Sequence, residues 1–101
     1  GSVAVALAAV LADLAKTHQV IVVTHLAQVA VRGERHFMVK KTAGAALNES
    51  EEANAAEAAI PETTLCELGE DERVREIARM LSGDASEASL AHAKEMLKNA
   101  R

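Results

Sequence analysis

The sequence contains no tryptophan or tyrosine, and phenylalanine and cysteine occur once each, as Phe37 and Cys66. Without aromatic rings the chain has no platform for stacking single-stranded bases and no aromatic cage for a quaternary cation. A single cysteine excludes an internal disulfide and a site built from several thiolates. No nucleophile motif surrounds Cys66, which we expect to be a small buried apolar side chain on a strand.

Two further shortages concern positive charge and long apolar runs. The chain has 11 Lys and Arg residues against 15 Asp and Glu residues, which gives a formal net charge of -4 at pH 7. This balance argues against a surface that displaces many counterions from phosphates. The apolar stretch from Val3 to Ala12 is too short to span a bilayer and lacks a basic flank, so we expect neither a membrane span nor a signal peptide.

The chain has 101 residues, enough for one domain (1–101), and 22 of them are alanines, so its core must be small. Apolar residues at helical spacing predict a first helix from Val3 to Leu14. The run Gln19–Thr24 is continuously β-branched, which is typical of a strand buried on both faces of a parallel sheet. A helix that leads into such a strand is half of a βαβ unit, so we expect the chain to be truncated at its start.

The middle of the chain predicts one short helix and two further strands. Residues 26–31 are long enough for one or two helical turns, and Arg35–Lys41 alternates as a half-exposed strand does. Thr63–Leu68 is predicted to pair with that strand. Residues 42–62, between the two strands, are rich in Ala and Glu and are predicted to form a flexible insertion without an apolar face.

Two helices are predicted to close the chain. Val74, Ile77 and Leu81 mark one face of the first, and Gly83 ends it. Asp84 or Ser86 can cap the second, whose buried side consists of Leu90, Ala93 and Leu97. The predicted fold class is therefore α/β, with a short sheet flanked by helices and a final pair of helices.

Thr24–His25 is the sharpest candidate site, because open α/β sheets bind ligands where a buried strand ends and a helix begins. An imidazole there can donate a hydrogen bond from one nitrogen and accept one at the other, as contact with a phosphate oxygen or a water requires. The alternative interpretation is that His25 merely caps the helix that follows. The position of His25 in the sequence does not by itself distinguish a ligand-binding role from a helix-capping role.

The patterns of the other polar residues indicate structural roles. His18, His36 and His92 lack the spacing of a zinc site, and we expect no metal to be bound. The acidic cluster Glu67, Glu70, Asp71 and Glu72 lies where it would stabilise a helix dipole. A helix-turn-helix is loosely suggested by three arginines on one helix, Arg73, Arg75 and Arg79. Acidic residues beside them would repel phosphates, so we expect these arginines to form a solvated face. No Gly-rich phosphate loop is present, so the chain alone cannot cradle a triphosphate.

Four segments in order resemble a known family. Residues 19–30 (QVIVVTHLAQVA), 35–41 (RHFMVKK), 72–83 and 91–97 (AHAKEML) are similar to the C-terminal part of the ABC-type ATPase head of the SMC-like RecN family of bacterial DNA repair proteins. The resemblance covers the chain outside residues 42–62 and implies part of a P-loop NTPase fold. Ala27 departs from the family's usual proline and is expected to loosen the loop after His25.

The resemblance implies a function for His25. It is the position of the family's switch histidine, which is both a catalytic and an ATP-contacting residue, because it reaches the γ-phosphate and helps hold the attacking water. The implied cofactors are ATP and Mg²⁺, bound by the full-length protein and not by this segment. The phosphate loop and Walker B carboxylates precede the matched region, so the segment alone is expected to be inactive.

The resemblance further implies partners and a location. These are the rest of the ATPase head, a second head in an ATP-bound homodimer, and DNA held by the full-length protein during recombinational repair of breaks in the cytoplasm, with no membrane. A rival hypothesis is a small α/β protein-interaction module without catalysis, in which the last two helices form a partner-binding surface. A third is a helix-turn-helix DNA regulator that uses the three arginines.

Overall fold

A computed structural model describes residues 2–41 and 62–100 of the chain. Within these ranges it is α/β, with four helices and one two-stranded antiparallel sheet. The chain divides into two compact units, one of residues 1–36 and 68–101 and one of residues 37–67. The insertion predicted at residues 42–62 lies outside the described residues except for Glu62, which is exposed.

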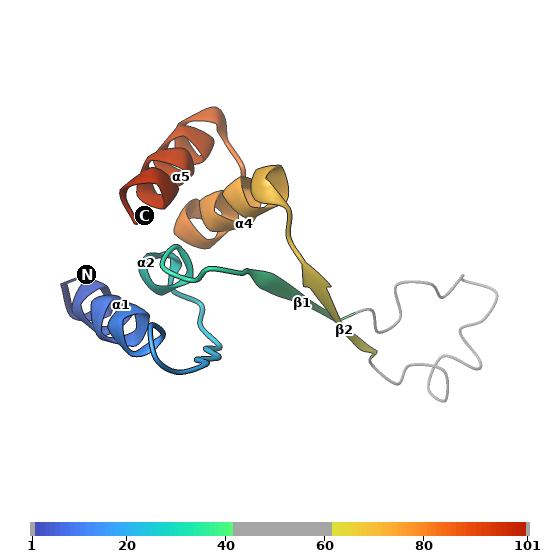
Figure 1. Ribbon diagram of the computed structural model, residues 1–101. Helices are drawn as coiled ribbons and strands as arrows, with labels where there is room; N and C mark the ends of the chain where they lie inside the picture. Colours follow the sequence, from blue (N-terminus) through green and yellow to red (C-terminus); the bar gives the residue numbers. More distant parts are fainter. Residues whose placement is uncertain (1, 42–61, 101) are drawn as a thin grey trace. The chain divides into compact units, whose positions relative to one another are not determined.

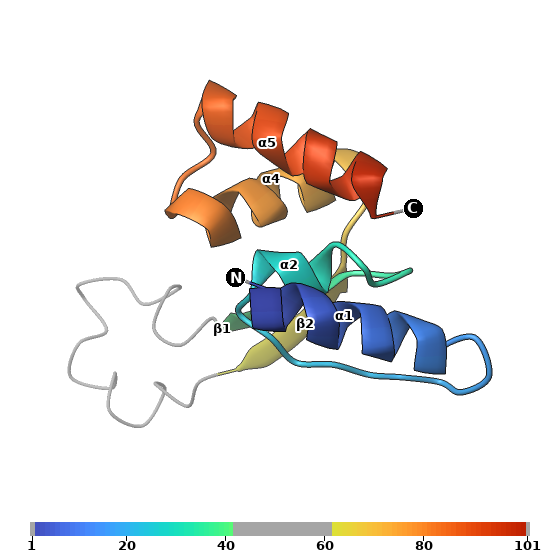
Figure 2. The same cartoon turned by 90° about the vertical axis from the view of Figure 1, so that its left-hand side faces the viewer.

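The first unit contains α1 (Ser2–Leu14), α2 (Ala27–Ala30), α4 (Glu70–Ser82) and α5 (Glu87–Asn99). Two perpendicular views place α2 between α1 and the pair formed by α4 and α5 (Figures 1 and 2). All four helices were predicted from the sequence, and the structure confirms them. The single turn of α2 is therefore the middle layer of this unit.

The core of the unit is small, as its alanine content requires. Its main cluster consists of Ala27, Val31, Ile77, Ala78 and Ala93, of which Ile77 is the largest fully buried side chain, and Ala4, Ala8 and Val29 are also buried. Partly buried apolar side chains surround it, mostly from α4 and α5. The buried residues thus come from all four helices of the unit, and α2 is packed between its neighbours although it has only four residues.

The ends of α4 and α5 are satisfied by local contacts. Glu72 Oε1 accepts the Gly69 N–H at 3.2 Å, and the first turn of α4 is acidic, as a helix dipole favours. Gly83 ends α4 in the left-handed conformation with φ 82°. Of the two predicted caps of α5, Ser86 is the one used, because its Oγ accepts the Ser89 N–H at 3.3 Å.

The second unit contains the strands β1 (Phe37–Lys41) and β2 (Thr63–Glu67). They pair antiparallel from Phe37 opposite Glu67 to Lys41 opposite Thr63, which confirms the predicted pairing across the long connection. The prediction that Cys66 is buried is wrong, since its thiol is exposed. A two-stranded sheet has too little surface to bury a side chain on either face by itself.

The prediction of a central strand at residues 19–24 is also wrong for this chain. These residues form no strand, and none of residues 19–25 makes a backbone–backbone hydrogen bond within the described part of the chain. Ile21 is 85% exposed and Val23 is 94% exposed. A β-branched run becomes a strand only beside another strand, and neither β1 nor β2 pairs with it.

Gly83→Ala is expected to lower the free energy of unfolding by about 1 kcal/mol, because a side chain disfavours the left-handed conformation. A Cβ at this position would meet no atom within 4 Å, so the cost is conformational and not steric contact with neighbours. Urea unfolding followed by helical circular dichroism measures the change. Gly83→Asn is the control and should cost less, since Asn tolerates this conformation. An equal loss in both variants would contradict the explanation.

Candidate functional site

The connection between the apolar run and α2 carries the candidate histidine. Thr24 Oγ1 accepts the N–H of Leu26 at 3.0 Å, which turns the chain around His25. The His25 side chain is exposed. Leu26 is the N-terminal cap residue of α2, and no side chain caps this end. The interpretation of His25 as a helix cap is therefore wrong, and the turn is made by Thr24.

The helix that follows His25 is held by apolar packing against neighbouring helices. Ala27, the first residue of α2, is 3% exposed, and Val29 and Val31 are also buried. Ala27 and Val31 belong to the same core cluster as Ile77 on α4. Burial of these side chains ties α2 to α4, although an isolated turn of helix has no stability of its own in water.

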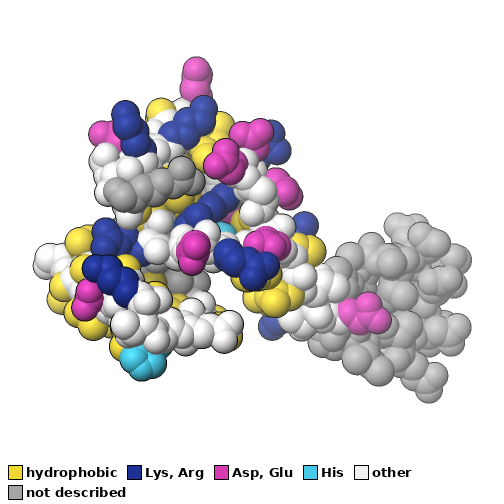
Figure 3. Space-filling model, viewed as in Figure 1, with side chains coloured by type: hydrophobic (Ala, Val, Ile, Leu, Met, Phe, Trp, Pro, Cys, Tyr) yellow, Lys and Arg dark blue, Asp and Glu magenta, His cyan; other side chains and the backbone are white. Residues whose placement is uncertain are grey.

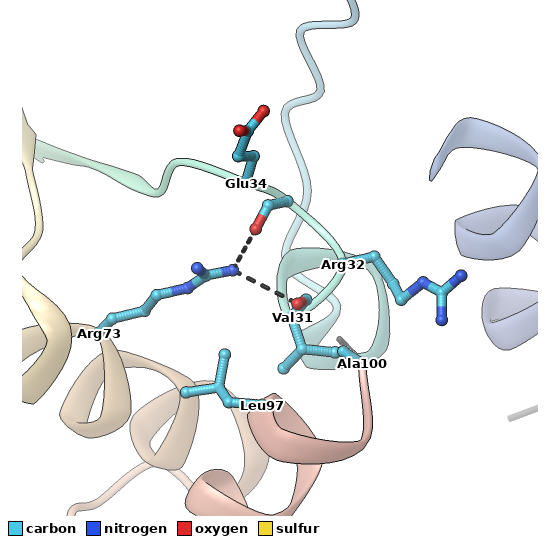
Figure 4. Close-up of a pocket in the computed structure, with 7 residues that line it drawn as sticks. Val31, Arg32, Glu34, Arg73, Leu97 and Ala100 are labelled. Carbon is cyan, nitrogen blue, oxygen red and sulfur yellow. Dashed lines mark hydrogen bonds between the residues drawn. The ribbon is translucent and has the colours of Figure 1, made fainter. Parts of the chain in front are cut away.

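A second restraint on α2 comes from Arg73, on the first turns of α4. Its Nη2 donates to the carbonyl oxygens of Ala30 at 3.0 Å, Val31 at 3.4 Å and Gly33 at 2.6 Å. Figure 4 shows the side chain extending from α4 to the turn that follows α2. A cation at this end stabilises the helix, because the last carbonyls of a helix have no partner within it and carry the negative end of its dipole.

These contacts correct the prediction that Arg73 belongs to a solvated arginine face. Its guanidinium is committed to backbone carbonyls, whereas Arg75 and Arg79 are exposed. Arg79 pairs with Glu76 through Nε to Oε2 at 2.8 Å and Nη2 to Oε1 at 2.5 Å. Sequence reasoning missed the role of Arg73 because about 40 residues separate it from the carbonyls that it binds, and no local pattern joins them.

A shallow pocket of about 330 Å³ lies beside Arg73. Its lining consists of Val31, Arg32, Gly33, Glu34, Arg73, Leu97 and Ala100. Figure 4 shows the Leu97 side chain below the Arg73 guanidinium and the carbonyl oxygen that it binds. The pocket lies between the turn after α2 and the end of α5, and Arg73 of α4 forms part of its wall.

His36 lies close to the charged residues of α4. Burial lowers the pKa of its imidazole, the cation of Arg73 lowers it further, and Glu76 acts in the opposite direction. Hydrogen bonds from Arg79 lower the pKa of the Glu76 carboxyl. Burial and Arg73 thus favour the neutral form of His36, whose Nδ1 is buried without a hydrogen-bond partner among the residues that the structure describes.

Neither a metal cluster nor a membrane helix is found in residues 2–41 and 62–100. No three His, Cys, Asp or Glu side chains in these ranges are grouped as metal ligands. No helix in them is both long and apolar enough to cross a bilayer.

The pKa of His36, followed by NMR titration of its ring protons in the chain, is expected to lie below 6.5. Arg73→Gln should raise it, because the variant removes a cation that disfavours the imidazolium. Arg73→Lys is the matched control and should raise it less, since the positive charge stays. A pKa of 6.5 or above in the unmodified chain would contradict the described surroundings of His36.

Comparison with known proteins finds several relatives that carry the same name. No protein-family model matches the chain. The chain is 45% identical to the DNA repair protein RecN of Deinococcus radiodurans over 96% of its own length and 15% of that relative. It is 40% identical to the RecN of Streptomyces coelicolor over its whole length and 39% identical to that of Treponema pallidum over 97% of it. The chain spans about one sixth of the length of these relatives.

Proposed function

Because this chain is a segment of a RecN-family protein, we propose that it forms the C-terminal part of an ABC-type ATPase head and supplies His25 to ATP hydrolysis. The full-length protein would then repair DNA breaks by recombination in the cytoplasm, as an ATP-dependent dimer of heads. The relatives carry the name of DNA repair proteins, which supports the repair role. The ATPase activity of the full-length protein that contains this chain is part of the proposal.

The observation that carries the proposal is the exposed His25 imidazole at the start of an anchored helix. Its backbone lies between the Thr24 turn and the buried Ala27, so the side chain is directed outward from a restrained segment. A group that assists phosphoryl transfer needs this combination, because it must meet a substrate from outside while its own position stays constant.

The chemistry proposed for His25 is positioning and electrostatic stabilisation. A neutral imidazole can accept a hydrogen bond from an attacking water at one nitrogen, or donate one to a γ-phosphate oxygen from the other. Such contacts act where charge develops and where the water must lie in line. In this proposal, other parts of the full-length protein supply the metal and the phosphate cradle, because this sequence contains no Gly-rich phosphate loop.

The exposed apolar surface supports the proposal that the rest of the head is a partner of this segment. On α1, Val3 is 81% exposed and Val10 65% exposed, and Ile21 and Val23 continue the surface along the chain. Figure 3 shows hydrophobic side chains exposed over the region of α1. An apolar surface of this kind is typical of an interface with another polypeptide surface. The run 19–24 would become a strand on pairing with the remainder of the head.

His25→Ala in the full-length protein is expected to lower kcat for ATP hydrolysis about 100-fold or more, because a group that contacts the transferred phosphoryl or its water is lost. ATP binding should change much less, since the phosphate cradle lies elsewhere. Steady-state kinetics and direct ATP titration separate the two. His92→Ala is the matched control, because His92 is also exposed but lies on α5.

Turnover that is unchanged in His25→Ala would overturn the proposed role of His25. A loss of the same size in His92→Ala would show that the effect does not belong to this position. An equal loss of ATP binding and turnover would assign His25 to binding alone.

Co-expression with the preceding part of the parent protein is expected to give a stable complex of this chain, whereas the chain alone self-associates. Val23→Lys should abolish the complex, because it places a charge in the proposed strand. Ala91→Lys, at an exposed position of α5, is the control and should leave the complex intact. Size-exclusion chromatography with light scattering measures both. A monomeric chain that binds nothing from the parent protein would instead favour the independent interaction module.

A further inference from the structure

We infer that Arg73 is a positioning residue for the His25 turn, acting through α2. The inference rests on the proposed function of His25. It names a residue on a distant helix that holds the histidine in place without touching ATP. Arg73 is part-buried, and its guanidinium is directed at the end of α2 opposite to His25 (Figure 4).

The first step is that α2 cannot hold its own position. Its internal hydrogen bonds are the few that one turn allows, among them Ala30 N–H to Leu26 O at 3.0 Å and Val31 N–H to Ala27 O at 3.0 Å. A helix of four residues is far below the length at which helices are stable alone. Its position is therefore set by contacts with other elements.

The second step is that the two ends of α2 are held differently. At the start of the helix Ala27 is buried and the Thr24 hydroxyl accepts the Leu26 N–H at 3.0 Å, but this bond is local, and residues 19–25 make no backbone–backbone hydrogen bond within the described part of the chain. At the other end one guanidinium nitrogen binds the carbonyls of Ala30, Val31 and Gly33. Hydrogen bonds with a charged donor are the stronger kind, so this end is the better restrained.

The third step connects this restraint to His25. Only Leu26 separates the histidine from α2, and α2 is a single helical turn, so a shift of α2 moves His25 with it. If Arg73 is removed, the carbonyls that it binds lose their cation, and α2 keeps only its apolar packing on neighbouring helices and the local hydrogen bond between Thr24 and Leu26. Apolar packing is non-directional, so it keeps α2 near α4 without fixing its rotation. A displacement of about 1 Å at a reacting group can cost about 100-fold in rate.

The experiment uses the full-length protein with Arg73→Gln, Arg73→Lys and Arg75→Gln. Arg75 is the matched control, because it is an exposed arginine on the same helix. Hydrogen exchange of peptides that cover residues 24–33 measures the restraint on α2. In Arg73→Gln it should rise about tenfold or more, while peptides of α4 and α5 change little.

Enzyme kinetics supply the functional readout. In Arg73→Gln, kcat should fall about 10- to 100-fold with ATP affinity nearly unchanged. Arg73→Lys keeps the cation and some of its hydrogen bonds, so it should recover part of both losses. Arg75→Gln should match the unmodified protein in exchange and in kcat. If Arg73→Gln does not fold, Arg73→Lys is compared with Arg75→Gln in the same two measurements. Faster exchange and a lower kcat in Arg73→Lys alone would then support the positioning role.

The outcomes separate this inference from the proposed function. Faster exchange in residues 24–33 together with a lower kcat supports the positioning role. A lower kcat without faster exchange overturns it, because Arg73 would then act elsewhere, and faster exchange with unchanged kcat reduces it to a structural contact. Unchanged turnover in His25→Ala overturns the proposed function itself, whatever the Arg73 variants show.

Discussion

The packing of α2 on α4 is the interaction on which the rest of the helical unit depends. Ala27 and Val31 provide the apolar part of this contact against Ile77, and Arg73 provides the polar part. Each part compensates for what the other lacks. Burial of small side chains supplies attraction with little direction, whereas the guanidinium supplies direction at three carbonyl oxygens. A four-residue helix needs both, because it has almost no stability of its own.

The alanine-rich composition explains why a charged group has this role. Ala27, Ala78 and Ala93 allow close approach of three helices but bury little surface each, and Ile77 is the largest fully buried side chain. A core of larger side chains could hold α2 by shape alone. Here the helices meet through small residues, so a long side chain that spans the gap beside Leu97 contributes much of the geometry.

The unpartnered apolar surface and the exposed histidine have a common explanation in the proposed function. A segment that completes a larger head must present apolar surface to the remainder and a polar group to the substrate. α1 and residues 19–23 have the first property, and His25, next along the chain after Thr24, has the second. Thr24 lies at the border between the two, where its hydroxyl accepts the N–H that turns the chain.

The sequence by itself determined what depends on local periodicity and local chemistry. The four helices, the stop at Gly83 and the position of His25 before a short helix all follow from residues close in the chain, as does the strand character of β1 and of β2, each taken by itself. Only the tertiary structure decided the features that depend on distant partners. Residues 19–24 have strand composition but no strand beside them, Cys66 is exposed on a sheet too small to cover it, and Arg73 binds carbonyls that no sequence pattern connects to it. The physical reason is the same in each case, because strand pairing, burial and long-range hydrogen bonds are made between segments, and a local pattern describes one segment at a time.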